Sequence, residues 1–224
     1  MPDQLSLTVT TASGSVVITG EDRSDIVVEG GKASVEEAPG EVVVQAKSSS
    51  LEVRCPAGTD VRVGTASGRV ELRGRLGDAR VTTKSSSIRV EEVEALELRS
   101  ASGSIDVGTC VGYCRLQSAS GSVKVGDAGD VDISAKSGSI KVGRAARGRV
   151  HGVSGSVEVG ATGEGDLDVR LISGSVKVTL PDGVRPRVRL RSVSGSARCD
   201  CEEGDDCCID VSSVSGSIQV STVS

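Results

Sequence analysis

Apolar and polar residues alternate over short stretches along the whole chain, and the alternation restarts at each copy of a Ser-Gly-Ser motif. Apolar residues stand three and five places after the first serine of a motif, as Ile105 and Val107 do, and six and four places before it, as Leu96 and Leu98 do. Strict alternation is typical of half-buried strands, and no segment keeps the i, i+3, i+4 stripe of a helix. Each repeat is therefore predicted to consist of a strand, a corner, a second strand and a turn.

The motif, or a close variant of it, recurs along the chain. Its middle residue is Gly14, Ser49, Gly68, Ser86, Gly103, Gly121, Gly138, Gly155, Gly174, Gly195 or Gly216. The first gap is 35 residues long, and a degenerate copy at residues 30–35 falls at its midpoint. With that copy counted, the chain has about twelve units at spacings of 17 to 21 residues.

Two short strands cannot enclose a core, but stacked repeats bury one another's apolar side chains. We therefore expect an all-β fold, a single-stranded parallel β-solenoid of about twelve coils that forms one domain over residues 1–224. The left-handed hexapeptide helix has coils of similar length, but it needs an aliphatic residue every six positions on three faces. Here the apolar pairs lie about nine positions apart, which predicts two main faces. The general preference of parallel crossovers favours a right-handed β-helix.

Composition agrees with thin, repeated layers. The chain has no Phe or Trp, a single Tyr and 29 Gly, so Val, Ile, Leu and Ala must build the core. The net charge is −5 and both signs are spread along the chain, which gives no footprint for nucleic acid. No apolar run approaches the roughly 20 residues that span a bilayer, and residues 1–15 do not resemble an export signal. As written, we expect a cytoplasmic chain without a transmembrane segment.

Several motifs carry a resemblance to a known family. They are SASGSIDV at residues 100–107, SASGSVKV at 118–125, SVSGSARC at 192–199 and SVSGSIQV at 213–220, with CPAGTDVRV at 55–63 and LPDGVRPRVRL at 180–190. Together they resemble the bacterial DUF4097 family of β-strand repeat proteins, whose members are provisionally named adhesins. The resemblance covers nearly the whole chain. It implies a right-handed β-helix, often attached to envelope or stress-response proteins through extra segments, and it carries over no catalytic motif.

The Ser-Gly-Ser motif itself is expected to be structural, because glycine permits a sharp corner and short hydroxyls bond to neighbouring backbone. A strip of hydroxyls and amides that binds carbohydrate or an anion is the alternative. The only histidine, His151, is at an outward position, so no serine has a partner base. Neither a Ser-His hydrolase nor a histidine-dependent acyltransferase is expected. We expect no catalytic residue, no cofactor and no enzymatic activity.

One cysteine cluster suggests a metal site. It consists of Cys199, Cys201, Cys207 and Cys208. Thiolates bind tetrahedral Zn²⁺, provided that the acidic turn at residues 202–206 folds back. The repeat register favours core positions instead, because Cys199 stands where other repeats have valine and Cys207 continues an apolar alternation. Buried cysteine behaves as a small apolar residue, and Cys55 and Cys114 are also in register. We therefore expect no metal site, with metal binding or a disulfide as the alternatives, while Cys110 and Cys208 lie off the main apolar positions.

The outward residues between the two apolar positions after each corner form one predicted face. This face is acidic in the early repeats, at Glu36, Glu52 and Glu71, and mostly basic in the later ones. The basic positions are Lys124, Lys141, Lys177 and Arg198. Most charged strand faces are only solvated, but these four residues are the candidate interaction surface of this chain.

These patterns favour a non-enzymatic interaction or scaffold protein. Its rigid solenoid face would bind an unknown protein or envelope component, with an adhesin-like role at the cell envelope as one form of this hypothesis. The alternative is a structural protein that assembles with itself. The last repeat, residues 215–224, has no evident polar cap, and an exposed edge strand invites a second copy to pair with it. A homo-oligomer through the solenoid ends is therefore the second hypothesis.

Overall fold

The computed structural model describes residues 5–222, which form thirteen β-strands and no helix. The predicted all-β class is confirmed. The chain divides into two compact units, Met1–Gly112 and Tyr113–Ser224, and strand β8 (Ile105–Ser120) contains the boundary between them. The expectation of one domain over residues 1–224 stays a prediction. Within the described part of the chain, no helix is long and apolar enough to cross a membrane.

The first unit contains seven complete strands. They are β1 (Ser6–Ser13), β2 (Ser15–Glu21), β3 (Val27–Gly30), β4 (Ala33–Ala38), β5 (Glu41–Ser48), β6 (Leu51–Pro56) and β7 (Asp60–Ser102). Strand β7 is 43 residues long, because the chain passes through its corners and turns without losing strand geometry. The strands lie in the order β4-β5-β1-β7 on one side and β3-β6-β2-β7 on the other.

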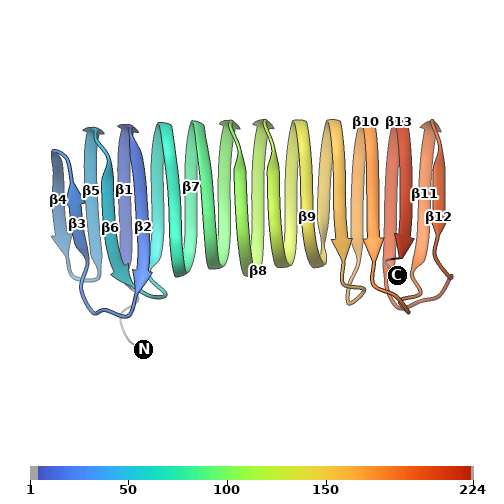
Figure 1. Ribbon diagram of the computed structural model, residues 1–224, viewed down its shortest axis with the longest axis horizontal. Coiled ribbons are helices and arrows are strands. Elements are labelled where there is room, and N and C mark those ends of the chain that lie inside the picture. Colours follow the sequence, from blue (N-terminus) through green and yellow to red (C-terminus); the bar gives the residue numbers. More distant parts are fainter. Residues whose placement is uncertain (1–4, 223–224) are drawn as a thin grey trace. The chain divides into compact units, whose positions relative to one another are not determined.

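The chain does not stack its first repeats in sequence order. Strand β1 lies between β5 and β7 and is parallel to both, so that Leu7 faces Val42 on one side and Val61 on the other. Strand β2 lies between β6 and β7 in the same way. The connection after β6 crosses the first coil, where the amide of Ala57 donates to the carbonyl of Glu21 at 2.8 Å. The first repeat is therefore held on both sides, with later residues outside it (Figure 1).

The outer layer of the first unit is an antiparallel cap. Strand β4 runs antiparallel to β5, with Val35 beside Val44, and β3 runs antiparallel to β6, with Val28 beside Val53. Strand β3 already runs antiparallel, so the chain reverses direction in the loop at residues 22–26, between β2 and β3. It reverses again at the turn that contains Gly40, whose φ of 78° favours glycine. The prediction that residues 30–35 form one more parallel repeat is wrong, because these two reversals make β3 and β4 run against their neighbours.

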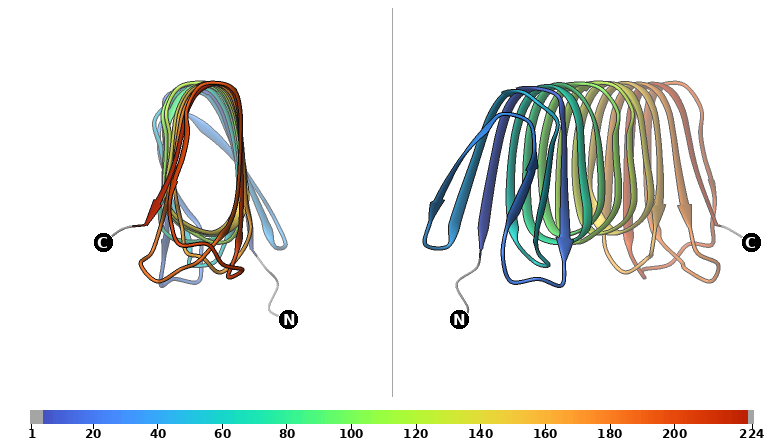
Figure 2. Two further views of the ribbon diagram at one scale, coloured as in Figure 1. Left: turned by 90° about the vertical axis from the view of Figure 1, so that its right-hand side faces the viewer. Right: turned by 60° about the vertical axis from the view of Figure 1, so that its left-hand side comes forward.

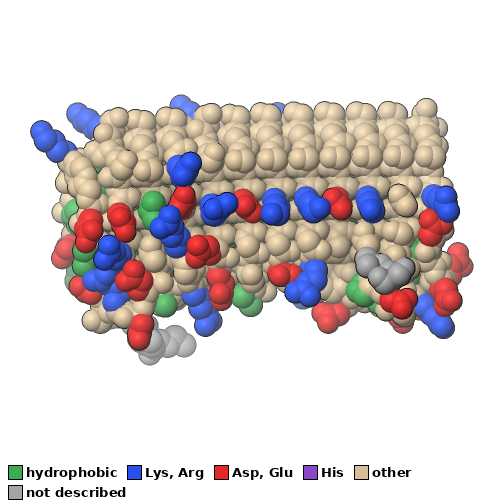
Figure 3. Space-filling model, viewed as in Figure 1, with side chains coloured by type: hydrophobic (Ala, Val, Ile, Leu, Met, Phe, Trp, Pro, Cys, Tyr) green, Lys and Arg blue, Asp and Glu red, His purple; other side chains and the backbone are tan. Residues whose placement is uncertain are grey.

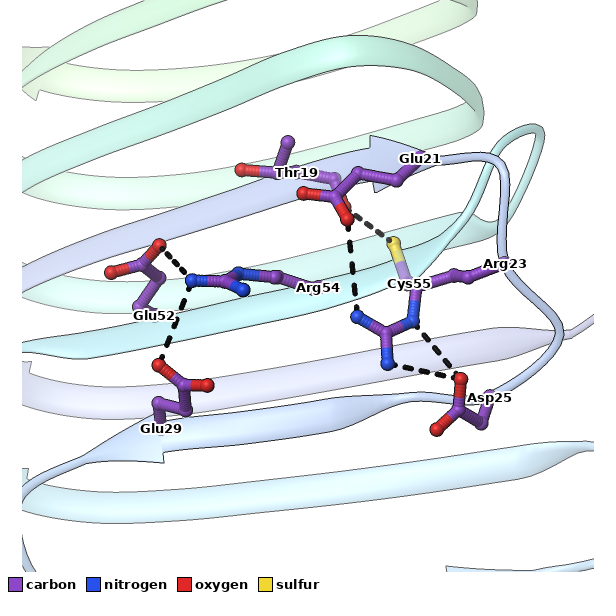
Figure 4. Close-up of polar contacts among 8 residues, drawn as sticks. All are labelled: Thr19, Glu21, Arg23, Asp25, Glu29, Glu52, Arg54 and Cys55. Atoms are coloured by element: carbon purple, nitrogen blue, oxygen red, sulfur yellow. Dashed lines mark hydrogen bonds and ion pairs between the residues drawn. The ribbon is translucent and has the colours of Figure 1, made fainter.

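Ion pairs fix the cap to the coil beneath it (Figure 4). Arg54 of β6 reaches Glu29 of β3 at 3.7 Å and Glu52 of its own strand at 3.4 Å. In the loop between β2 and β3, Arg23 contacts Asp25 at 3.0 Å. Several of these side chains are well exposed, so each pair stabilises the unit by less than about 1 kcal/mol. Their main effect is to set the position of β3 on β6.

The second unit reverses its last two layers as well. Besides its part of β8, it contains β9 (Val123–Ala161), β10 (Leu167–Leu180), β11 (Arg187–Ser194), β12 (Ala197–Asp200) and β13 (Cys208–Thr222). Strand β13 lies parallel between β10 and the pair β11 and β12, so that Ile209 faces Leu167 on one side and Val188 on the other. The connections at residues 181–186 and 201–207 supply the length to cross a layer (Figures 1 and 2).

The expectation that residues 215–224 form the exposed end is therefore wrong for the part that the structure describes, since residues 223–224 lie outside it. The outermost strands of the second unit are β11 and β12. Equivalent repeats offer equivalent neighbours, so the alternating pattern does not decide which of two successive repeats lies outside.

The core consists of the predicted apolar positions. Of the eleven pairs three and five places after the corners, ten are at most 3% exposed, as Ile105, Val107, Ile218 and Val220 illustrate. The exception is the pair Ala197 and Cys199 in β12, because no further strand among the described residues covers β12. Parallel registers within each unit agree with stacked repeats, whereas the number of coils and their handedness stay predictions.

A third inward row lies seven to nine places after the first serine of most motifs. It includes Leu76, Val93, Cys110 and Leu180, all at most 1% exposed. The expectation of two main apolar faces is incomplete, and Cys110 belongs to the core. Cys55 of this row was placed in register from the sequence, but most of the row was not, because the number of residues between corner and turn varies from repeat to repeat.

Most Ser-Gly-Ser corners require glycine, whereas the two variant corners at Ser49 and Ser86 have no positive φ. Gly138 has a φ of 121°, and a Cβ atom added to it would overlap the carbonyl oxygen of Gly121 in the coil beside it. Gly155 and Gly174 repeat this geometry on their own neighbours. The corners therefore fix how closely the backbones of adjacent coils approach.

We predict that Gly138→Ala lowers the free energy of unfolding by about 3 kcal/mol or more, because it adds both left-handed strain and a backbone clash. Gly183→Ala is the matched control. Gly183 has a φ of 82° but no atom within 4 Å of the added Cβ, so its cost is about 1 kcal/mol. Urea unfolding followed by circular dichroism measures both, and equal losses would contradict the close-approach explanation.

Candidate functional site

The predicted basic residues lie in one row on the second unit. Register places Lys177 of β10 beside Glu158 of β9 and Gln219 of β13, and Gln219 beside Arg198 of β12. Lys124 and Lys141 lie on the preceding passes of β9, and all four predicted residues are exposed. Figure 3 shows this row as mostly basic side chains interrupted by acidic ones.

Two of the four cations already have a partner. Lys141 pairs with Glu158 at 3.1 Å, and Arg198 pairs with Asp200 at 2.8 Å. Within residues 5–222, Lys124 and Lys177 have no carboxylate within ion-pair distance. These two lysines are therefore the available charges of the row.

The corresponding row of the first unit is largely neutralised. Glu71 accepts hydrogen bonds from Arg73 and lies 3.5 Å from Arg69, and the bond from Arg73 lowers the pKa of this carboxyl. The predicted member Glu36 is not part of this row, because β4 belongs to the cap and pairs with β5. Glu29 of β3 takes the place beside Glu52 instead.

An exposed aliphatic ridge lies around the corner from the basic row. It is formed by Val153, Ile172, Val214 and Val193, in spatial order, with 45%, 52%, 50% and 83% of each residue exposed. The registers that set Ser154 beside Ser173, Ser173 beside Ser215 and Ser215 beside Ser194 make the four ridge residues neighbours. We name these four residues the corner ridge.

The corner ridge was missed from the sequence, although a signal was present. The residue just before the motif is Ala or Lys in the earlier repeats, such as Ala119 and Lys136, and becomes Val or Ile from residue 153 onward. In a repeat whose core is already complete, a change to a larger aliphatic residue at an outward position has no role in packing. Contiguous exposed apolar side chains mark binding surfaces more often than isolated ones do.

Basic side chains border the corner ridge on both sides. Lys177 and Arg198 lie beyond the corner, and Arg170 and Arg191 lie two places before Ile172 and Val193. Arg170 is held by Asp168 at 2.8 Å, whereas Arg191 has no ion pair among the described residues. Lys177 and Arg191 are therefore the bordering cations without an ion pair among the described residues.

The Ser-Gly-Ser hydroxyls separate the ridge from the basic row. In the first unit, the hydroxyls of Ser13 and Ser48 lie 2.7 Å apart, and those of Ser85 and Ser102 lie 3.1 Å apart. Hydroxyls two places before the motif donate to a carbonyl of the corner, as Ser213 does to Ser215 at 3.3 Å. These bonds agree with the structural role expected for the motif, and nothing tests its alternative role in binding carbohydrate or an anion.

A shallow groove of about 690 Å³ lies elsewhere on the second unit and is rich in aspartate. Four of its five aspartates have partners within the protein. Tyr113 donates to Asp132 at 3.0 Å, Arg147 lies 3.6 Å from Asp130, the amide of Cys208 donates to Asp166, and Arg170 pairs with Asp168. Burial and the bond to Asp132 raise the pKa of Tyr113. Among residues 5–222, no group of three or more His, Cys, Asp or Glu side chains is arranged to hold a metal ion.

The cysteine cluster converges only in part, because Cys201 shares a side-chain hydrogen bond with Cys199, whereas Cys207 and Cys208 point to opposite sides. Cys207 is 4% exposed and faces inward, while the next residue, Cys208, faces outward and is exposed. Neighbouring residues of an extended chain point to opposite sides, which separates these two thiols. Cys199 was expected in the core but is exposed, because β12 is the outermost strand. Cys55 and Cys114 are buried, as predicted.

We predict that iodoacetamide at pH 8 modifies Cys208 of the native protein much faster than Cys201. Burial is the main cause that raises the pKa of Cys201 to about 11, with its neighbour Cys199 as the next cause. Only roughly a thousandth of its thiol is then ionised at pH 8, and the thiolate is the reactive form. Peptide mass spectrometry over time measures both rates of modification. Equal rates would contradict the claim that the raised pKa of Cys201 slows its reaction.

Comparison with known proteins identifies the family. No curated protein matches the chain. A solved structure from Clostridium sporogenes ATCC 15579, provisionally described as a cell adhesion protein, is similar at 10% identity and a TM-score of 0.22, over 99% of this chain and 93% of that chain. The model of the Toastrack DUF4097 family matches residues 3–224. The chain therefore belongs to the Toastrack DUF4097 family.

Proposed function

We propose that this chain is a non-enzymatic interaction or scaffold protein that binds an acidic protein partner through the corner ridge and the basic residues beside it. The finer fold behind the proposal is a single-stranded parallel β-solenoid in each unit. Such a fold suits the role, because parallel stacking places equivalent side chains of successive repeats in straight rows. An adhesin-like role at the cell envelope is one form of the proposal.

The corner ridge is the observation that carries this function. Its four aliphatic side chains are exposed by 45% to 83%, and they are adjacent in the strand register. Leaving them in water costs free energy that a partner recovers on binding. Since the core is complete without them, contact with another molecule accounts for their position better than folding does.

The charges around the ridge favour an acidic partner. Lys124 and Lys177 lie without ion-pair partners in the described part of the row, and Arg191 borders the ridge from the opposite side. Complementary charge chiefly increases the rate of association and excludes basic competitors. The apolar ridge then supplies the affinity of the bound state.

A protein suits the ridge better than a lipid surface does. Interfacial membrane binding relies on Trp, Phe and Leu side chains that enter the boundary between headgroups and acyl chains. The chain has no Trp or Phe, and the ridge consists of three Val and one Ile. Short branched side chains in a row are better matched to an apolar groove of a protein.

We expect no catalytic function, because the side chains that most resemble catalytic groups are already in contact with other residues of the protein. The aspartates Asp130 and Asp132 of the groove are engaged by Arg147 and Arg115. The histidine His151 lies beside Arg170 in the strand register. These contacts support structural roles for the groups that most resemble catalytic ones.

We predict that Ile172→Asp combined with Val214→Asp abolishes capture of the partner by the immobilised protein from native lysate. The change places carboxylates where the partner needs apolar contact and where its own charge is acidic, so binding weakens at least about tenfold, or 1.4 kcal/mol. Val111→Asp is the matched control, because Val111 is 62% exposed and lies in the first unit. This control retains the partner.

Charge reversal at Lys124 and Lys177 tests the second part of the surface. Lys124→Glu with Lys177→Glu reduces capture, and the reduction is larger at low salt, where the charges are poorly screened. Sedimentation with anionic phospholipid vesicles is run in parallel. The proposal is wrong if captured proteins are indifferent to the ridge variants, or if the chain binds the vesicles and no ridge-dependent protein.

A further inference from the structure

Each unit has one edge of β-strands that lacks a neighbour. In the first unit, β3 and β4 pair only with β6 and β5, and in the second unit, β11 and β12 pair only with β13. The outward hydrogen-bonding groups of these strands therefore have no strand partner within the described residues. Such edges bind added strands, including strands of a second copy of the same chain.

The second-unit edge also leaves its core side chains uncovered. Val188 and Leu190 of β11 are half-buried, whereas Ile209 and Val211, which occupy the same positions one layer inward, are 0% exposed. The buried hydroxyl of Ser192 has no hydrogen-bond partner in the described part of the chain. This layer therefore has the same apolar residues as an inner coil, but no further strand of the described chain covers them.

The first-unit edge has a smaller apolar surface. Val35 of β4 is 43% exposed, although it faces the same way as the buried Val44 beside it. Each edge thus offers both unpaired backbone and some apolar surface. Covering them recovers part of the same free energy that stabilises the inner layers.

The charges of the two edges are opposite. Strand β11 exposes Arg189 and Arg191, which have no ion pair among the described residues. Strand β4 exposes Glu36 and Glu37, which likewise have none. Other edge charges are already used, since Arg187 pairs with Asp205 and Arg54 holds Glu29 (Figure 4). The available charge is therefore positive on β11 and negative on β4.

We propose that copies of this chain associate head to tail, with strand β11 of one copy adding to strand β4 of the next. The outward Glu36 then meets the outward Arg189 and Arg191. Glu37 faces the same way as Val35, so it adds to the negative charge of the edge without meeting these arginines directly. The half-buried Val188 and Leu190 gain cover. A contact between two different edges leaves one edge of each kind free on every dimer, so it adds further copies into chains or closed rings. This inference goes beyond the binding function proposed above and does not depend on the corner ridge.

Charged edges commonly protect a sheet from aggregation, and the signs here make that protection selective. Two β11 edges repel each other through their arginines, and two β4 edges repel each other through their glutamates. Only the unlike pair is attractive. Repulsion between like charges therefore disfavours dimers through two identical edges and leaves the head-to-tail contact available.

Sedimentation velocity of the whole chain tests the proposal from about 1 µM to about 1 mM, a range that covers weak self-association. The average mass is expected to rise with concentration without a plateau at the dimer. Raising the salt from about 0.05 M to about 0.5 M should reduce the mass, because it screens the exposed charges. A mass that stays monomeric over the whole range overturns the proposal, and so does a plateau at the dimer.

Two edge variants give the decisive comparison. Glu36→Arg with Glu37→Arg makes both edges basic, and Arg189→Glu with Arg191→Glu makes both edges acidic. Each variant alone should need at least about tenfold higher concentration to assemble. An equimolar mixture should assemble again, because every junction then joins an acidic edge to a basic one. Lys84→Glu with Lys136→Glu, at exposed positions off both edges and off the proposed binding surface, should assemble like the unaltered chain.

Recovery in the mixture also shows that both variants are folded. Assembly of either variant alone at the unaltered concentration overturns the proposal. A mixture that stays monomeric, with both variants folded by circular dichroism, overturns it as well. None of these outcomes involves Ile172 or Val214, so failure of the head-to-tail contact is distinguishable from failure of the binding function.

Discussion

The structure depends on contact between coils, because no single coil of this chain can bury its own apolar side chains. The inward residues are Val, Ile, Leu, Ala and Cys, and each row is completed by the equivalent residue of the next coil. Glycine at the corners allows the close backbone approach that this contact requires, as at Gly138. A coil is therefore stable only when a neighbouring coil covers it. The outermost layer of each unit is covered on one side only.

The outermost layers of the two units have different structures. The first unit ends in an antiparallel cap, β3 and β4, which Arg54 contacts through Glu29. The second unit ends in β11 and β12, whose inward residues Val188 and Leu190 are only half-buried. In both units a neighbouring repeat of the chain lies inside the outer layer, paired on both of its sides. This arrangement keeps the segments next to the described chain ends within the sheet, where fraying is costly.

Much of the fold could be predicted from the sequence, for reasons that particular residues make clear. Pairs such as Ile105 and Val107 have a fixed distance from their corner, so alternation alone places them in the core. Cys110 was not predicted, because the distance from corner to third row varies between repeats. The order of the layers could not be predicted either, since Leu7 can face Val42 or Val61 equally well and in fact faces both.

The candidate site was less predictable. The row that contains Lys124 and Lys177 followed from register, but the partners of Lys141 and Arg198 depend on side-chain positions that the repeat does not specify. The corner ridge was present in the sequence as a change in residue type at one repeat position, and it became a surface only when the register joined Ile172 to Val214. Its recognition required the neighbours of each residue, which alternation does not give.

Hydrogen–deuterium exchange of the second unit, at a concentration where the chain is monomeric, tests the central claim most directly. In the second unit, the edge formed by β11 and β12 is outermost, although β13 follows it in the sequence. Amides of residues 208–222 should therefore exchange more slowly than amides of residues 187–200, because β13 has a strand on both sides. Faster exchange at residues 208–222 than at residues 187–200 would place β13 at the edge and contradict the account.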